Sequence, residues 1–189
     1  MGRVGDWIKQ REDQKLLRIF GVTFDEYRLK CAAAEKSQEK LEHLERFISE
    51  CSSDFVTSVI MAKVKDAVCI VSQKISYNPL QGKPCDIELY LYATEFDRYI
   101  QQGYLWAELQ TDVVSGNCVA DIQDIQGTPK KGYGSLMMEI LIRQCRWIGV
   151  SKIQGYLSPV DEDHRERQLH FYKKFGFCQV GSNVRLELK

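Results

Sequence analysis

The spacing of apolar residues divides the chain into a helical first part and a strand-rich second part. Apolar positions lie loosely on one helical side over residues 6–20, and they recur every three or four residues over 41–51. Thr23 and Glu26 have the spacing of a capping box, which predicts that a second helix begins there. We therefore expect an N-terminal helical segment over residues 1–52.

The pattern changes at about residue 55, where β-branched and aromatic residues alternate with polar ones. This alternation predicts strands in VCIVSQKISY, DIELYLYA, GYLWAELQTDVV and NCVADIQDI. Turn-forming residues separate strands at 78–84 and 115–117. The stretch TEFDRYIQQG (94–103) is predicted to form one short helix, ended by Gly103.

A strand–turn–helix–strand unit follows. Strand 119–125 leads through QGTPKK into a helix that Gly149 can end, and KIQGYL (152–157) is the next strand. Because such a unit joins parallel strands, these two strands are predicted to run parallel. The apolar helix positions, with a period near 3.6, are Leu136, Met137, Ile140, Leu141, Trp147 and Ile148.

The sequence of the turn before this helix predicts a site for an anion, and phosphate is the anion that it fits best. Gly132 and Gly134 let an anion approach the unpaired N–H groups of the first helical turn. A P-loop is excluded because Tyr133 follows Gly132 where that motif has lysine. A dinucleotide fingerprint is excluded because Met137 occupies the place of the third glycine.

Charge and cysteine content narrow the function classes. Lys plus Arg and Asp plus Glu both number 26, which argues against the broad basic surface of a nucleic-acid-binding protein. Residues 126–176 nevertheless hold nine basic and five acidic residues, so positive charge gathers where the anion is expected. The seven cysteines form no C-x-x-C pair, so neither a disulfide framework nor a metal site is predicted. We see no signal peptide or membrane span and expect a cytoplasmic protein.

Two motifs resemble the GNAT superfamily of acetyl-CoA-dependent N-acetyltransferases. PKKGYGSLM (129–137) is similar to the family's [Q/R]-x-x-G-x-[G/A] turn, and LHFYKKFGF (169–177) is similar to its closing helix. The resemblance covers about residues 118–180. It departs from the family at Pro129, where the family has Gln or Arg, and at Arg165, where it often has asparagine. The family also places two helices after its first strand, whereas here the helices come before the strands.

The resemblance implies an α/β (α+β) fold, a mixed central sheet flanked by helices, over residues 53–189. It implies that acetyl-CoA is the co-substrate and that an amine acceptor attacks its thioester directly. Tyr172 stands at the position of the family's general acid. The residues expected to hold the cofactor are Ile125, Lys130, Lys131, Gly132, Tyr133, Gly134 and Ser135, chiefly through the backbone amides of 131–135.

The general base is left open. Asp121 and Asp124 lie on the central strand and are expected to alternate faces, so only one of them points towards the substrate and serves as the base; water is the alternative base. Acidic residues and His164 also follow the next strand, where Asp161 or Asp163 is equally explained as a helix N-cap. Any of these carboxylates could instead attract a cationic amine.

Other functions remain as rival hypotheses. The same fold could be a non-catalytic CoA-binding or protein-interaction module, with Pro129 a mark of lost catalysis. The helical segment could pack on the chain's own sheet or contact a partner, including a second copy in a homodimer. The acceptor stays open among small polyamines, aminoglycosides, amino acids, protein N-termini and lysines, and its slot is expected within residues 55–117.

Overall fold

The computed structural model describes residues 24–53, 58–65, 67–95, 98–112, 116–157 and 165–188. The chain divides into two compact units, residues 1–49 and 50–189. Helix α2 (Phe24–Ser53) supplies the described part of the first unit, and its start and end confirm the predicted second helix. The helix expected over residues 6–20 lies outside the described residues. None of the described helices combines the length and apolar character needed to cross a bilayer.

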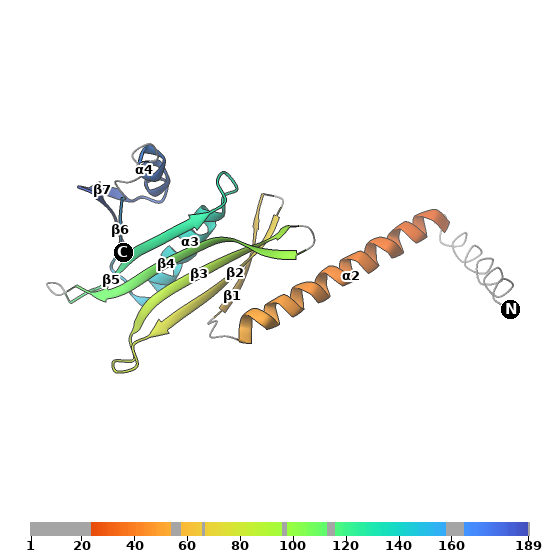
Figure 1. Ribbon diagram of the computed structural model, residues 1–189, viewed down its shortest axis with the longest axis horizontal. Coiled ribbons are helices and arrows are strands. Elements are labelled where there is room, and N and C mark those ends of the chain that lie inside the picture. The colour runs from red at the N-terminus through yellow and green to blue at the C-terminus, as the bar shows by residue number, and fades with distance from the viewer. Residues whose placement is uncertain are drawn as a thin grey trace. The chain divides into compact units, whose positions relative to one another are not determined.

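The second unit is built on one eight-stranded mixed sheet, in the order β1-β2-β3-β4-β5-β6-β8-β7 (Figure 1). All neighbouring strands are antiparallel except β5 and β6, which are parallel as predicted. The strands are β1 (Ser58–Val64), β2 (Ala67–Tyr77), β3 (Pro84–Glu95), β4 (Arg98–Thr111), β5 (Cys118–Gly127), β6 (Lys152–Tyr156), β7 (Cys178–Val180) and β8 (Asn183–Glu187). The mixed α/β fold class is therefore confirmed.

The predicted helix over residues 94–103 is wrong, because residues 94–95 and 98–103 belong to two paired strands. Strand β3 runs to Glu95 and β4 begins at Arg98, with Tyr99 opposite Thr94 and Ile100 opposite Ala93. Pairing between β3 and β4 overrides the helical propensity of this polar stretch. Strand β1 had no separate prediction, since its seven residues show weak alternation.

Helix α3 (Tyr133–Ile148) covers one face of the sheet, across β3, β4 and β5 (Figure 1). Met137, Leu141 and Cys145 are fully buried and follow one another at four-residue spacing, which confirms the helical periodicity. Gly149 ends the helix in a left-handed conformation with φ 86°. Trp147 does not belong to the buried stripe as expected: it is 76% exposed, since it lies roughly 200° around the helix from Cys145.

A pair of glycines lets α3 approach the sheet closely. Gly103 on β4 lies opposite Gly127 on β5. A Cβ added to Gly103 would lie 2.7 Å from the Met137 Cε, and one added to Gly127 would lie 3.8 Å from the same atom. The side chain of Met137 therefore fills the space that two missing side chains leave, and this fixes the first turns of α3 against the sheet.

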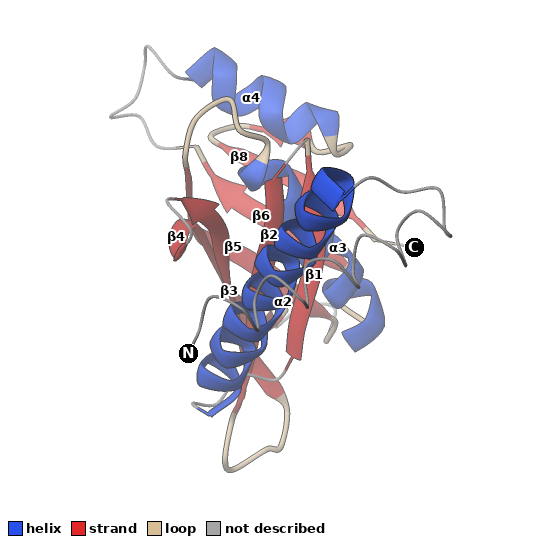
Figure 2. Cartoon of the chain, turned by 90° about the vertical axis from the view of Figure 1, so that its right-hand side faces the viewer, coloured by secondary structure: helices blue, strands red, loops and turns tan. Residues whose placement is uncertain are grey.

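Helix α4 (Arg165–Lys174) lies next to the β7–β8 end of the sheet (Figure 2). Tyr172 is buried on its inner side, and its ring meets that of Phe177 edge-on with centroids 5.2 Å apart. Gly176, with φ 86°, turns the chain back so that buried Phe177 can lead into β7. The aromatic contacts hold the Tyr172 side chain in a defined place.

Replacing Gly103 by alanine should destabilise the second unit by about 1–3 kcal/mol, because the new methyl group overlaps Met137. In urea denaturation, Met137→Leu should remove much of that loss from the double variant, since leucine lacks the methionine's terminal methyl group. If the double variant lost as much free energy of unfolding as the two single variants together, this packing would be contradicted.

Candidate functional site

The two parallel strands separate at a residue without a side chain. The register of β5 with β6 ends at Ile122 and Gly155, while β5 continues to Gly127. A Cβ on Gly155 would lie 3.4 Å from the Ile122 Cβ and 3.6 Å from the phenol oxygen of Tyr172. The Tyr172 hydroxyl therefore stands where the strands diverge.

The turn between β5 and α3 leaves the start of the helix without a cap. Gly132 occupies the N-cap position with φ 92°, and no described side chain caps the helix there. The first turn also lacks an acidic residue. Its N–H groups and the positive end of the helix dipole are thus available to an anion.

A bulge in β4 anchors the beginning of this turn. Gln102 is the extra residue of β4, between the pairs that Gln101 and Gly103 make with β3. The Thr128 backbone N–H donates to the Gln102 carbonyl at 3.1 Å, and the Thr128 hydroxyl donates to the Gln102 side-chain oxygen at 2.6 Å. These bonds hold Thr128 at the exit of β5.

Helix α4 supports the same turn from the other side. The ring of Phe171 lies 3.6 Å from where a Cβ on Gly134 would be. The Lys174 ammonium donates to the Ser135 hydroxyl at 3.0 Å. The first turn of α3 is therefore held from two directions, with a cation beside it.

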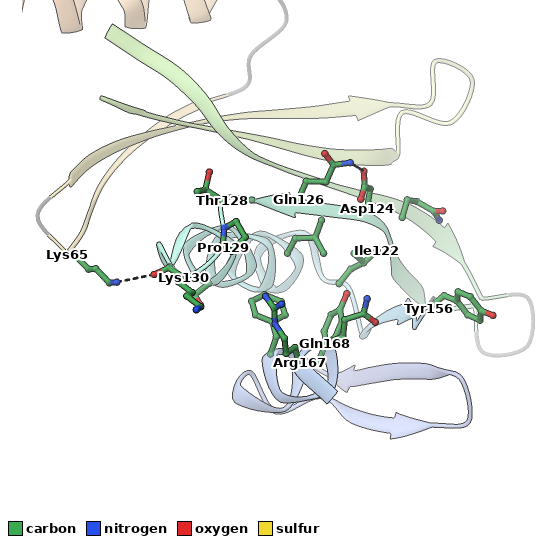
Figure 3. A pocket seen from close by; sticks show the side chains of 18 residues that line it. Lys65, Ile122, Asp124, Gln126, Thr128, Pro129, Lys130, Tyr156, Arg167 and Gln168 are labelled. Atoms are coloured by element: carbon green, nitrogen blue, oxygen red, sulfur yellow. Dashed lines mark hydrogen bonds between the residues drawn. The ribbon is translucent and has the colours of Figure 1, made fainter. Parts of the chain in front are cut away.

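These elements enclose one cavity of about 840 Å³, a volume typical of small-molecule sites. In Figure 3 it lies between β5 and α4, with Lys65 at one end and Tyr156 at the other. Its charged lining residues are Lys65, Lys130, Arg167 and Asp124, so cations prevail.

Most of the predicted site residues line this cavity. Those that do are Tyr172, Asp124, Ile125, Lys130, Gly132, Gly134 and Ser135. Lys131 is exposed beside the turn without lining the cavity, and the Tyr133 side chain is buried in the core. Asp121 lies outside the lining. The acidic residues at 161–163 and His164 lie outside the described residues.

The expectation that Asp121 and Asp124 alternate faces is wrong. Asp121 is paired with Glu108 and Asp124 with Trp106, two residues that share one face of β4. An irregularity in β5 between these pairs adds one residue, Gln123, and restores both carboxylates to the same face. Of the two, Asp124 reaches the cavity, where the Gln126 amide donates to it at 2.7 Å.

Burial changes the acidity of two of these groups. Desolvation, and secondarily the negative charge of Asp124, raises the pKa of Tyr172 to about 12. The phenol is therefore a proton donor, not an anion, throughout the neutral range. Desolvation also raises the pKa of Asp121, whose carboxylate accepts a hydrogen bond from Gln154.

Several lining residues were not predicted. Arg167 and Gln168 lie on α4 just before the closing motif. The four-residue spacing of Gln168 from Tyr172 could have found Gln168, whereas Arg167, five residues before Tyr172, carried no such signal. The side-chain oxygen of Gln168 is buried and accepts no hydrogen bond from any described residue. Such an orphaned acceptor fits a ligand N–H. Lys65 belongs to no motif and carried no signal.

Comparison with known proteins gives limited sequence similarity. No family model matches the chain. The uncharacterized protein YocC of Bacillus subtilis (strain 168) is 38% identical over 56 residues, which make up 30% of this chain and 34% of that protein. The match therefore spans about a third of the curated relative.

Solved structures resemble the chain in three dimensions. A mutant form of a cAMP-binding acyltransferase from Mycobacterium smegmatis superposes with a TM-score of 0.51 at 12% identity, over 76% of this chain and 51% of that one. The chain therefore shares the fold of this acyltransferase, a mixed sheet flanked by helices of the kind that the resemblance to the GNAT superfamily implies. The parallel β5–β6 pair that diverges at Gly155, between the glycine turn and the closing helix, belongs to this frame.

Two further solved structures superpose with lower TM-scores. A putative GNAT-family acetyltransferase from Desulfovibrio desulfuricans has a TM-score of 0.40 at 21% identity, over 53% of this chain and 68% of that one. The GNAT domain of S. lividans PAT has a TM-score of 0.45 at 11% identity, over 72% of this chain and 97% of that one.

Gly132→Ala should lower the free energy of unfolding more than Gly149→Ala. Both glycines are left-handed, which costs an alanine roughly 1–2 kcal/mol. Only at Gly132 would the new Cβ also press on a neighbour, the Val64 Cγ1 at 3.1 Å. Urea denaturation should show the excess loss, and Val64→Ala should reduce it. An equal loss in the two glycine variants would mean that β1 does not pack on the turn.

Proposed function

We propose that the chain is an N-acetyltransferase that moves an acetyl group from acetyl-CoA to a primary amine by direct attack in a ternary complex. One observation carries the proposal. The uncapped start of α3 and the Tyr172 hydroxyl lie along one cavity, so a phosphate-bearing acyl donor can be held at one end and react at the other.

The residues in and beside the cavity fit acetyl-CoA. The amides of residues 131–135, with Lys130, Lys131 and Ser135, would hold the pyrophosphate. The part of β5 beyond the end of its pairing with β6, around Ile125, would offer backbone groups to the amides of the pantetheine arm. The unpartnered oxygen of Gln168 would accept one of the arm's N–H groups.

Tyr172 would act as the general acid. As the amine nitrogen bonds to the acetyl carbon and the carbon–sulfur bond breaks, the phenol would give its proton to the departing sulfur. The amine would lose its own proton to water or to Asp124, which lines the cavity. No covalent bond between the acetyl group and the protein is needed.

The charges near the reaction point favour a cationic amine. Asp121, Asp124 and Glu108 share the face of the sheet opposite α3. Their carboxylates would attract a protonated amine before it is deprotonated for attack. The acceptor itself would be found by testing polyamines, aminoglycosides, amino acids and peptides.

A second candidate is a CoA-binding module without catalysis. Two observations favour it: Pro129 removes the side chain that the family uses at that position, and the raised pKa of Tyr172 makes its phenol a weak acid. Such a module would bind acetyl-CoA with the same cavity but acetylate nothing.

Tyr172→Phe should lower kcat for an acceptor found in that panel by at least about a hundredfold, because the proton donor is lost. The Kd for acetyl-CoA should stay within about twofold, since phenylalanine retains the ring packing against Phe177. Tyr77→Phe, which alters an exposed tyrosine on β2, serves as the matched control with unchanged kcat.

The pH profile of the wild-type enzyme adds a second readout. Because the pKa of Tyr172 is held near 12, kcat/KM should rise with pH to a plateau set by the acceptor amine, with no alkaline fall below about pH 10. Unchanged kcat in Tyr172→Phe would refute its role as the acid. Tight binding of acetyl-CoA without acetylation of any amine would favour the non-catalytic module.

A further inference from the structure

We propose that Lys65, in the turn between β1 and β2, binds the pyrophosphate of the coenzyme and supplies the cation that Pro129 does not. This inference rests on the proposed function, because it assigns a residue to the acetyl-CoA site. It concerns an element far from both motifs in the sequence.

Direct contacts place the β1–β2 turn against the anion turn. The Lys65 ammonium donates to the Lys130 carbonyl at 3.0 Å, as the dashed line in Figure 3 shows. Val64 lies so near Gly132 that a Cβ there would be 3.1 Å from its Cγ1. Lys65 also lines the cavity itself.

The backbone shows that both contact residues are held in an unfavourable conformation. Lys65 (φ 54°) and Lys130 (φ 62°) are the two non-glycine residues with left-handed φ in the described part of the chain. In this conformation the Cβ crowds the backbone, and such strain tends to persist at functional sites. Here the two strained residues are joined by a hydrogen bond, and both line the same cavity.

The chemistry of the ammonium group leaves Lys65 capacity for a ligand. A lysine has three N–H donors, and the Lys130 carbonyl uses one of them. The remaining donors and the full positive charge lie at the end of the cavity opposite Tyr156, beside the uncapped start of α3. A pyrophosphate bound to those amides would lie within the reach of this cation.

The connection of β1 to β2 makes this approach feasible. Only residues 65 and 66 separate the two strands, so a short hairpin end meets the anion turn. The family's usual pair of helices at this point would occupy the connection instead. Lys65 is therefore a feature of this chain, not of the motif.

The test is calorimetric titration of the full chain with CoA and with 3′-dephospho-CoA at several salt concentrations. Lys65→Gln should weaken both ligands roughly tenfold and make the Kd less dependent on salt. Lys65→Arg should retain most of the affinity. Lys63→Gln is the matched control, because Lys63 is an exposed residue of the adjoining strand outside the cavity, and should bind like the wild type.

Each other outcome contradicts the assignment. Wild-type affinity in Lys65→Gln would overturn it while leaving the proposed function intact. A loss for CoA but not for dephospho-CoA would place Lys65 at the 3′-phosphate instead. If Lys65→Gln left the salt dependence of the Kd unchanged, and Lys65→Arg lost as much affinity as Lys65→Gln, then Lys65 would only shape the turn. Should Lys65→Gln fail to fold, Lys65→Asn replaces it, because asparagine tolerates left-handed φ. No CoA binding by the wild type would reject the proposed function first.

Discussion

The uncapped first turn of α3 is the constraint around which the site is arranged. Its N–H groups need partners, and no described side chain caps them where Gly132 and Gly134 line the cavity. Three separate elements hold this turn and the loop before it in position: the β4 bulge through Thr128, the β1–β2 turn through Lys65, and α4 through Phe171. A helix end held this rigidly is suited to an anion that must be bound without rearrangement.

The sheet contributes through its irregularities. The bulge at Gln102 directs one residue of β4 towards the start of the turn, and the extra residue Gln123 in β5 moves Asp124 onto the face it shares with Asp121. The end of the β5–β6 register at Gly155 then leaves room for the Tyr172 hydroxyl. Regular strands would have placed none of these groups where they are.

The sequence predicted what depends on neighbours in the chain. The helix from Tyr133 to Ile148 and the parallel strands around it follow from apolar periodicity and from glycines at the helix ends. The strand over residues 98–103 was missed, because pairing with β3 outweighs a helical composition. The shared face of Asp121 and Asp124 was missed for a related reason: the register with β4 sets it. Lys65 could not be predicted, since its contact joins residues 65 positions apart.

The central claim is that the glycine turn binds the pyrophosphate of CoA, and a thermal-shift titration with acetyl-CoA tests it most directly. The wild type should melt about 5–10 °C higher at a hundred times Kd. Gly134→Asp should abolish the shift by placing a carboxylate in the turn, whereas the neutral, equally large Gly134→Asn should retain more of it. A Cβ at residue 134 would make an ordinary van der Waals contact with the Phe171 ring, at 3.6 Å, in both variants. No shift in the wild type, or the same shift in all three proteins, would contradict the account.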